Sequence, residues 1–232
     1  MSEAGLGPKL IYGCSDYRIE SFFEGRPLTI WELRNPVVME ETVKSLFAMH
    51  NNQRLIDSIE EIIPKQPSRL GIDVAIEEWG PAVITKIAKI RSKLNPESAG
   101  ADTILNTLKK LETTYLKPGY QEVLRNLVPR EKIVLSHNDV QENNILSSLE
   151  DATRFILIDY EYGMWNPQSY DLACYLNEMV CDNAYPLGCG VFHYMRNFPS
   201  EAEIELMTKT YCALDAQREN RVEEWSMERL EC

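Results

Sequence analysis

Three side chains of the sequence stand at spacings that suit phosphoryl transfer. Asp139 follows the apolar run KIVLS within the stretch SHNDVQENNIL, Asn144 comes five residues later, and Asp159 closes the later apolar run RFILID. Phosphoryl transfer needs a carboxylate that orients and deprotonates the attacking hydroxyl, and oxygen ligands for the Mg²⁺ that offsets the charge of the nucleotide phosphates. Asp139 suits the first role, and Asn144 and Asp159 suit the second.

The elements that must position these side chains are short strands. The runs KIVLS, NILSS and RFILID have the length and composition of strands, and LEDAT predicts the turn between the last two. Protein kinases carry a catalytic Asp, a metal-binding Asn at this spacing and a second Asp on the next hairpin, although here that Asp stands in IDYEYG rather than DFG. The alternative is a polar β-turn, in which Asp and Asn are common, but turn chemistry does not require the whole set together. We expect His137 to be a buried residue that holds the loop backbone rather than an acid or a base.

The rest of the chain predicts one hairpin followed mainly by helices. Residues 9–23 read as two strands around a turn, and EGRPL then interrupts the pattern. Asn35 and Pro36 predict the start of a helix that ends near His50. One face of this helix carries Met39, Val43, Leu46, Phe47 and His50. Helices and loops are expected over residues 51–128, with breaks at Pro64, Pro67, Pro81, Pro96 and Pro118.

Helices are expected again around SYDLACYLNEMV and after Ser200, where Ser200 and Glu203 predict a capping box.

Composition narrows the class of protein and its partners. The net charge of −12 argues against a nucleic-acid partner and favours a cationic small molecule, although acidic surfaces also serve solubility. No apolar run reaches the roughly 18 residues of a membrane span, and the first ten residues do not form a signal peptide, so a cytoplasmic protein is expected. The six cysteines are expected to be reduced thiols, because the spacings of Cys174, Cys181, Cys189 and His193 are not those of a zinc site.

Three segments together resemble the choline/ethanolamine kinases: SHNDVQENNIL, LIDYEYGMWNPQSYDLACYLNEM and RIESFFEGRPLTIWELRNP. The resemblance covers roughly residues 5–215. It implies an α+β, protein-kinase-like fold: a mostly helical C-terminal lobe over residues 26–232 with a small catalytic-loop hairpin. Residues 1–25 would then be a remnant β-hairpin of the N-terminal lobe and the link between lobes.

The activity that the resemblance implies is transfer of the ATP γ-phosphoryl group to the hydroxyl of choline or ethanolamine, the first step of phosphatidylcholine or phosphatidylethanolamine synthesis. EGRPLTIWELR resembles the choline members somewhat more. The implied partners are ATP, Mg²⁺ and the cationic amino alcohol, and a homodimer is compatible with the resemblance.

The resemblance also implies roles for individual residues. Asp139 would be the catalytic base, Gln141 would orient it and the substrate, and Asn144 and Asp159 would hold Mg²⁺, with Glu161 joining them. Tyr162 and Glu178 would bind the cationic head, for which the alternatives are a core tyrosine and a solvated helix face. Asp171 is expected to cap its helix or brace the catalytic loop. Phe22, Phe23 and Glu24 would meet the nucleotide, and their alternative is the end of an ordinary strand.

The sequence also departs from the family. Nothing before residue 9 matches the family's phosphate-covering loop, strand lysine and helix glutamate, which position the nucleotide phosphates. Other aromatic residues for a choline cage are Trp165 and Tyr185, and Asn183 stands where the family tends to have a tyrosine. The alternative functions are therefore a catalytically silent, kinase-like binding module and, more remotely, a phosphotransferase for aminoglycosides or other polycationic alcohols.

Overall fold

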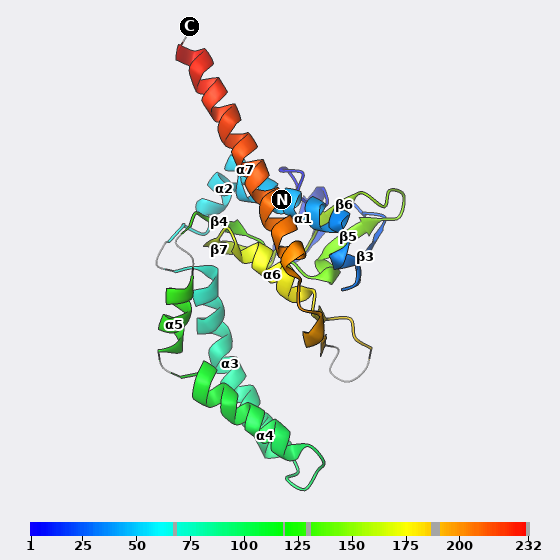
Figure 1. Ribbon diagram of the computed structural model, residues 1–232, viewed down its shortest axis with the longest axis vertical. Helices are drawn as coiled ribbons and strands as arrows, with labels where there is room; N and C mark the ends of the chain where they lie inside the picture. Colours follow the sequence, from blue (N-terminus) through cyan, green and yellow to red (C-terminus); the bar gives the residue numbers. More distant parts are fainter. Residues whose placement is uncertain (67–68, 118, 129–130, 187–190, 231–232) are drawn as a thin grey trace. The chain divides into compact units, whose positions relative to one another are not determined.

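The computed structural model describes residues 1–66, 69–117, 119–128, 131–186 and 191–230 (Figure 1). The chain forms two compact units. The first contains Met1–Lys65, Val134–Met164 and Gln168–Cys232, and the second contains Gln66–Ile133 and Trp165–Pro167. All three candidate phosphoryl-transfer residues lie in the first unit.

The first unit begins with the expected hairpin. Strand β1 (Leu10–Gly13) pairs antiparallel with β2 (Arg18–Glu20), and Leu10 lies opposite Glu20. A three-stranded antiparallel sheet follows, in the order β3 (Gly25–Pro27), β5 (Ile145–Ser148), β6 (Phe155–Leu157). The β5–β6 hairpin was predicted from the sequence, and its turn lies at LEDAT as expected.

Strand β3 corrects the expectation that EGRPL only interrupts the pattern. Gly25 pairs with Ser148, and a Cβ atom built on Gly25 would lie 2.7 Å from the carbonyl oxygen of Ser147 and 2.5 Å from the ring of Phe23. Only glycine allows this approach. Gly25, which we expected to interrupt the strand pattern, therefore permits β3 to pair with β5, about 120 positions later.

The remaining strands of the chain are short. Strand β4 (Ile133–Ser136) leads into the polar stretch at residues 137–144, as predicted. Strand β7 (Met164–Pro167) and the antiparallel pair β8 (Cys181–Asp182) and β9 (Phe192–His193) were not predicted.

Two helices of the first unit begin at the predicted residues. Helix α1 spans Pro36–His50, and the side chain of Asn35 caps it by accepting a hydrogen bond of 3.0 Å from the backbone N–H of Val37. Helix α7 spans Glu201–Leu230 and begins with the predicted capping box of Ser200 and Glu203. The others are α2 (Gln53–Glu60), α6 (Tyr170–Glu178) and three 3₁₀ turns, η1 (Glu32–Arg34), η3 (Glu142–Asn144) and η4 (Met195–Asn197).

The core of this unit lies where α7 packs along α1 (Figure 1). Fully or nearly fully buried side chains from α1, the strands, α6 and α7 form one cluster, which includes Met39, Leu46, Ile145, Tyr175 and Met207. The polar loop that follows β4 contacts this apolar cluster through Val140, which is part of it.

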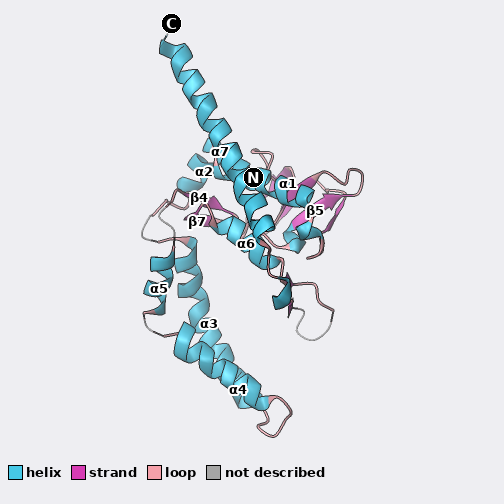
Figure 2. Ribbon diagram, viewed as in Figure 1, coloured by secondary structure: helices cyan, strands magenta, loops and turns pink. Residues whose placement is uncertain are grey.

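The second unit is mainly helical (Figure 2). It contains α3 (Gly71–Lys93), α4 (Ala101–Lys110), the π-helical turn η2 (Leu111–Tyr115) and α5 (Tyr120–Leu127). The guanidinium of Arg91 in α3 binds both carboxylate oxygens of Glu112 in η2, at 2.9 and 2.7 Å. Helices were predicted here, but the break expected at Pro81 is wrong, because Pro81 lies inside α3.

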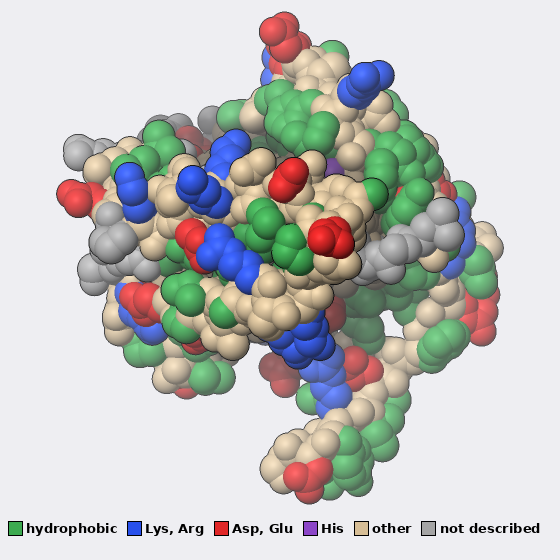
Figure 3. All heavy atoms as spheres, turned by 90° about the horizontal axis from the view of Figure 1, so that it is seen from below, with side chains coloured by type: hydrophobic (Ala, Val, Ile, Leu, Met, Phe, Trp, Pro, Cys, Tyr) green, Lys and Arg blue, Asp and Glu red, His purple; other side chains and the backbone are tan. Residues whose placement is uncertain are grey.

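The described surface mixes charged and hydrophobic side chains, and the described cysteines are free thiols. One face of the molecule carries acidic and basic side chains next to hydrophobic ones (Figure 3). No helix in the described ranges combines the length and the apolar character that crossing a bilayer requires. Cys14, Cys174, Cys181 and Cys212 are free thiols, and Cys189 and Cys232 lie outside the described residues.

Candidate active site

The loop after β4 is held by the side chain of its first residue. His137 is fully buried, its Nδ1 accepts a hydrogen bond of 3.3 Å from the backbone N–H of Asp139, and its Nε2 lies 3.0 Å from the carbonyl oxygen of Ile158. Because Nδ1 accepts, the ring hydrogen is on Nε2 and is donated to Ile158. This agrees with a structural role for His137, which ties the loop to the end of β6.

Asp171 of α6 holds the same loop from the other side. Its Oδ2 accepts a hydrogen bond of 2.8 Å from the backbone N–H of His137, and its Oδ1 accepts one of 2.8 Å from that of Asn138. Asn138 has a φ of 68°, in the left-handed region that few non-glycine residues adopt. Of the two expected roles, Asp171 therefore braces the loop; Ser169 is the residue at the N-cap of α6.

Asp139, Gln141 and Asn144 form one hydrogen-bonded group. Asn144 donates from Nδ2 to the carboxylate of Asp139 at 2.7 Å and to its carbonyl oxygen at 2.9 Å, and Gln141 donates to the same carboxylate at 3.3 Å. These bonds leave the carboxylate in a fixed orientation. They also engage the amide nitrogen of Asn144, so its Oδ1 is free to act as an acceptor.

Asp159 lies beside this group because the backbone N–H of Ile158 donates to the carbonyl oxygen of Asn144 at 3.0 Å. Asp159 is exposed and has a φ of 64°. Apart from Asn138, it is the one non-glycine residue of the described chain in the left-handed region. Backbone strain of this kind occurs at functional sites more often than elsewhere.

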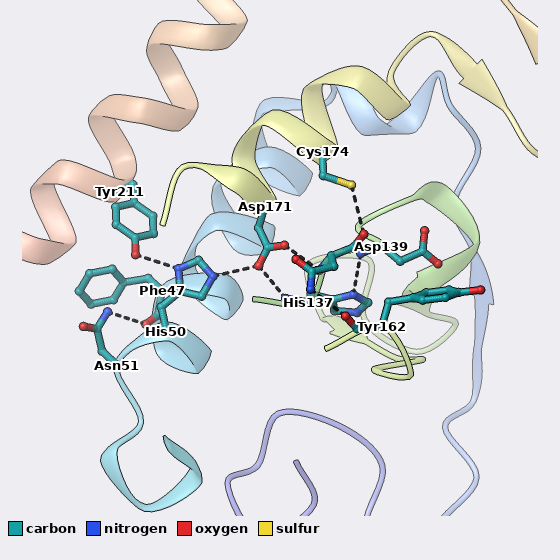
Figure 4. A network of polar contacts seen from close by, with 10 residues as sticks. Phe47, His50, Asn51, His137, Asp139, Tyr162, Asp171, Cys174 and Tyr211 are labelled. Carbon is teal, nitrogen blue, oxygen red and sulfur yellow. Dashed lines mark hydrogen bonds and ion pairs between the residues drawn. The ribbon is translucent and has the colours of Figure 1, made fainter. Parts of the chain in front are cut away.

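Three carboxylates act on the hydroxyl of Tyr162. The negative charge of Glu161 raises the pKa of the Tyr162 hydroxyl, and burial and the charges of Asp139 and Asp159 raise it further. Tyr162 is 42% exposed, and its ring lies beside Asp139 in Figure 4. Its carbonyl oxygen accepts a hydrogen bond of 2.7 Å from the side chain of Asn138. The structure therefore does not favour the alternative of a core tyrosine.

The donor set fits a magnesium ion that is shared with phosphates. Asn144, Asp159 and Glu161 offer two carboxylates and one amide oxygen. Within the described ranges there is no group of three or more His, Cys, Asp or Glu side chains that could hold a metal by itself. Mg²⁺ usually takes one or two carboxylates and completes its shell with water and substrate phosphates. The residues thus suit a metal that binds together with a nucleotide.

A pocket of about 620 Å³ joins the predicted nucleotide residues to Asp159. Phe22 and Phe23 line it together with Ile158, Asp159 and Glu161. Glu24 is not among the residues that line it, and its carbonyl oxygen accepts from the backbone N–H of Leu149 at 3.0 Å.

The only cationic side chain among the described residues of this pocket is Arg18. It lies 3.2 Å from the carboxylate of Glu20. Arg18 is a candidate partner for phosphate that the sequence did not reveal, because an arginine on a short strand gives no signal of its own.

Glu178 belongs to a second acidic group near the loop. Asn183 donates from Nδ2 to Glu178 at 2.8 Å and to Glu142 at 3.2 Å, and its backbone N–H donates to Glu142 at 2.8 Å. Burial raises the pKa of both carboxyls, and the charges of Glu142 and Asp139 add to the effect on Glu178. Glu178 is therefore not on a solvated helix face. Glu142 and Asn183 were not predicted to take part.

The two other aromatic side chains considered for a choline cage, those of Trp165 and Tyr185, have their own surroundings in the structure. Trp165 is 1% exposed, so the expectation that its ring is available to a substrate is wrong. The ring of Tyr185 packs against Phe192 at a centroid distance of 4.9 Å.

Known proteins resemble this chain along most of its length. The family model described as choline/ethanolamine kinase matches residues 1–230. A human choline/ethanolamine kinase is 27% identical over 220 residues, which cover 88% of this chain and 50% of the human protein. A probable choline kinase of Arabidopsis thaliana is 25% identical over 218 residues, covering 94% and 54%. The chain thus spans about half the length of these curated relatives.

The fold has a counterpart among solved structures. A crystal structure of a choline kinase from Cryptosporidium parvum superimposes with a TM-score of 0.65 at 24% identity and covers 93% of this chain and 59% of that one. Similarity at this identity establishes the fold, a mixture of helices with small antiparallel sheets.

Proposed function

The chain belongs to the choline/ethanolamine kinase family, and from this premise we propose that it transfers the γ-phosphoryl group of ATP to the hydroxyl of choline or ethanolamine. The observation that carries the proposal is the bond of 2.7 Å between Asn144 and Asp139, which joins the proposed base to a proposed metal ligand. A binding module without activity has no need for that arrangement.

In the proposed mechanism Asp139 accepts the proton of the substrate hydroxyl as its oxygen attacks the γ-phosphorus and the bond to the bridging oxygen of ADP breaks. Asn144 and Gln141 hold the carboxylate in place through their amide hydrogens. Asn144, Asp159 and Glu161 would hold Mg²⁺, whose charge offsets that of the phosphates when it is bound. Phe22 and Phe23 would contact the base of the nucleotide in the 620 Å³ pocket.

The cationic head of the amino alcohol would lie between Tyr162 and Glu178. A cation over a desolvated aromatic ring gains roughly 2 kcal/mol, and the exposed ring of Tyr162 is beside Asp139. The negative charge of Asp139 contributes to the raised pKa of Glu178. With the cationic head held by Tyr162 and Glu178, the hydroxyl end of the substrate would point toward Asp139.

A second candidate is a silent binding module. It is favoured by one observation: Arg18, the one cationic side chain among the described residues of the pocket, is paired with Glu20. Positioning of the nucleotide phosphates in kinases depends on positive and backbone partners that this pocket would have to supply by other means.

The test is incubation of the purified chain with ATP, Mg²⁺ and either choline or ethanolamine, with ³¹P NMR to detect the phosphorylated alcohol. Product from the unaltered chain, reduced by about 10² or more in Asp139→Ala but not in Asp151→Ala, would support the proposal. Asp151 is a suitable control because it lies in an exposed turn. Equal rates in the chain and in Asp139→Ala would remove Asp139 from the reaction, and ATP binding without any product would favour the silent module.

A further inference from the structure

A continuous buried chain of polar contacts connects α7 to the catalytic loop (Figure 4). The hydroxyl of Tyr211 in α7 lies 2.8 Å from Nδ1 of His50, and Nε2 of His50 lies 2.9 Å from Oδ2 of Asp171. The proposed mechanism uses none of these three side chains directly. Their exposed fractions are 5%, 0% and 0%, so water does not compete for these contacts.

The direction of the Tyr211–His50 and His50–Asp171 hydrogen bonds follows from the carboxylate of Asp171, which accepts hydrogen bonds. Asp171 accepts from the backbone N–H groups of His137 and Asn138, and its Oδ2 also faces Nε2 of His50. A carboxylate oxygen accepts, so His50 carries its hydrogen on Nε2 and presents a lone pair at Nδ1. The Tyr211 hydroxyl then donates to Nδ1. Asp171 thereby selects the tautomer of His50, and the hydrogen bond from Tyr211 to Nδ1 stabilises that tautomer.

These contacts fix the carboxylate of Asp171, which in turn holds the backbone of the catalytic loop. Asp171 holds the backbone of Asn138, which has the strained φ of 68° and directly precedes Asp139. Two backbone N–H groups of adjacent residues do not by themselves stop the carboxylate from turning with the loop. A third donor on a different helix anchors it to α1, and α1 is packed against α7.

We infer that His50 and Tyr211 are positioning residues for Asp139. They act through Asp171 and touch no substrate. The inference rests on the proposed function for its effect on rate, but its structural content, that Tyr211 controls the order of the loop backbone, can be measured without any activity.

The first experiment uses NMR on the full chain. The sequence contains three histidines, so ¹⁵N-histidine labelling gives three imidazole patterns, and His50→Gln identifies that of His50. His50 should show a protonated Nε2 and an unprotonated, hydrogen-bonded Nδ1. In Tyr211→Phe the Nδ1 resonance should shift, and the amides of His137 and Asn138 should exchange with deuterium at least roughly 10-fold faster relative to the slowest core amides.

Tyr175→Phe is the matched control. Tyr175 is fully buried, and its hydroxyl donates a hydrogen bond of 2.6 Å to the carbonyl oxygen of Leu33 in η1 rather than to a side chain of the His50–Asp171 network. This variant also loses one buried tyrosine hydroxyl, but it should leave both loop amides and the His50 pattern unchanged. If the two variants changed these amides equally, Tyr211 would be an ordinary core residue and the inference would be overturned.

The second experiment measures rates, if the chain proves active. Tyr211→Phe should lower kcat by roughly 10-fold or more with KM for the alcohol and ATP within 2-fold, because a displaced base slows the chemical step more than binding. Tyr175→Phe should change neither parameter. His50→Gln keeps an N–H donor that can reach Asp171, so it should recover part of the rate that His50→Leu loses.

The outcomes separate the two proposals. If the chain is inactive but Tyr211→Phe still speeds the exchange of the loop amides, the inference stands and the proposed function is refuted. If the chain is active but Tyr211→Phe changes neither kcat nor the exchange of the loop amides, the proposed function stands and the inference is refuted.

Discussion

Asn183 donates a hydrogen bond of 2.8 Å from Nδ2 to Oε2 of Glu178, and the same nitrogen lies 3.2 Å from Oε2 of Glu142. One amide group thus serves two carboxylates. Glu142 is 1% exposed, and burial raises the pKa of both carboxyls. Folding therefore confines two carboxyls whose charged forms water would solvate better, which costs stability.

Glu178→Gln should make the protein more stable at neutral pH. Because the pKa of Glu178 is raised in the folded state, ionisation opposes folding, and this penalty is complete above the folded-state pKa and disappears below the unfolded value near 4.5. Gln keeps an oxygen that can accept from Asn183 and carries no charge. Thermal unfolding should show Tm a few degrees higher for the variant at pH 7 and no difference near pH 4. A difference that stays constant between these pH values would exclude burial of the charge as its cause.

Asp171→Asn should destabilise the fold strongly. The carboxylate accepts from His137, Asn138 and His50, and an amide in its place would turn an NH₂ group toward one of these donors. Breaking a fully buried charged network usually costs about 3 kcal/mol or more. Urea unfolding measures the change in the free energy of unfolding. Asp151→Asn, in an exposed turn, is the control, and similar losses in both variants would contradict the bracing role.

Asn144→Ala and Asp159→Asn should differ in their dependence on Mg²⁺. Asp159→Asn removes one proposed ligand charge and should raise the Mg²⁺ concentration needed for half-maximal rate. Asn144→Ala also removes the hydrogen bond of 2.7 Å to Asp139, so its kcat should stay low at saturating Mg²⁺. Titrating the initial rate with Mg²⁺ at fixed ATP distinguishes them. Full recovery of Asn144→Ala by Mg²⁺ would show that the bond to Asp139 does not matter for the rate.

Cys174 should resist alkylation in the native protein. Burial raises the pKa of its thiol to about 12, and its Sγ lies 3.9 Å from the carbonyl oxygen of Asn138 in the catalytic loop. The thiolate is the reactive form, so little of it is present at pH 8. Iodoacetamide followed by peptide mass mapping should modify the exposed Cys14 and Cys212 well before Cys174. Rapid labelling of Cys174 would mean that the loop opens readily.

The sequence predicted best what is local. Asn35, Pro36, Ser200 and Glu203 act within one helical turn of their own helix, so both helix starts were predicted correctly. The spacing of Asp139 and Asn144 predicted one loop, and the two side chains do bond to each other.

What the sequence did not predict depends on distant contacts. Strand β3 forms because Gly25 lies against Ser147. His50 stood on the apolar face of its helix without an evident partner. Its partners Asp171 and Tyr211 come 121 and 161 positions later, beyond the reach of any local pattern.

The separation of His50 and Tyr211 has a consequence for synthesis on the ribosome. A nascent chain that has emerged as far as residue 180 already carries Asp139, Asn144, Asp159 and Asp171, but not the helix that supplies Tyr211. Chains emerge at about 5 to 20 residues per second, and contacts between distant segments form late. We therefore expect the catalytic loop to be among the last segments that acquire their final conformation, and chaperones that act during translation would meet it in an open form.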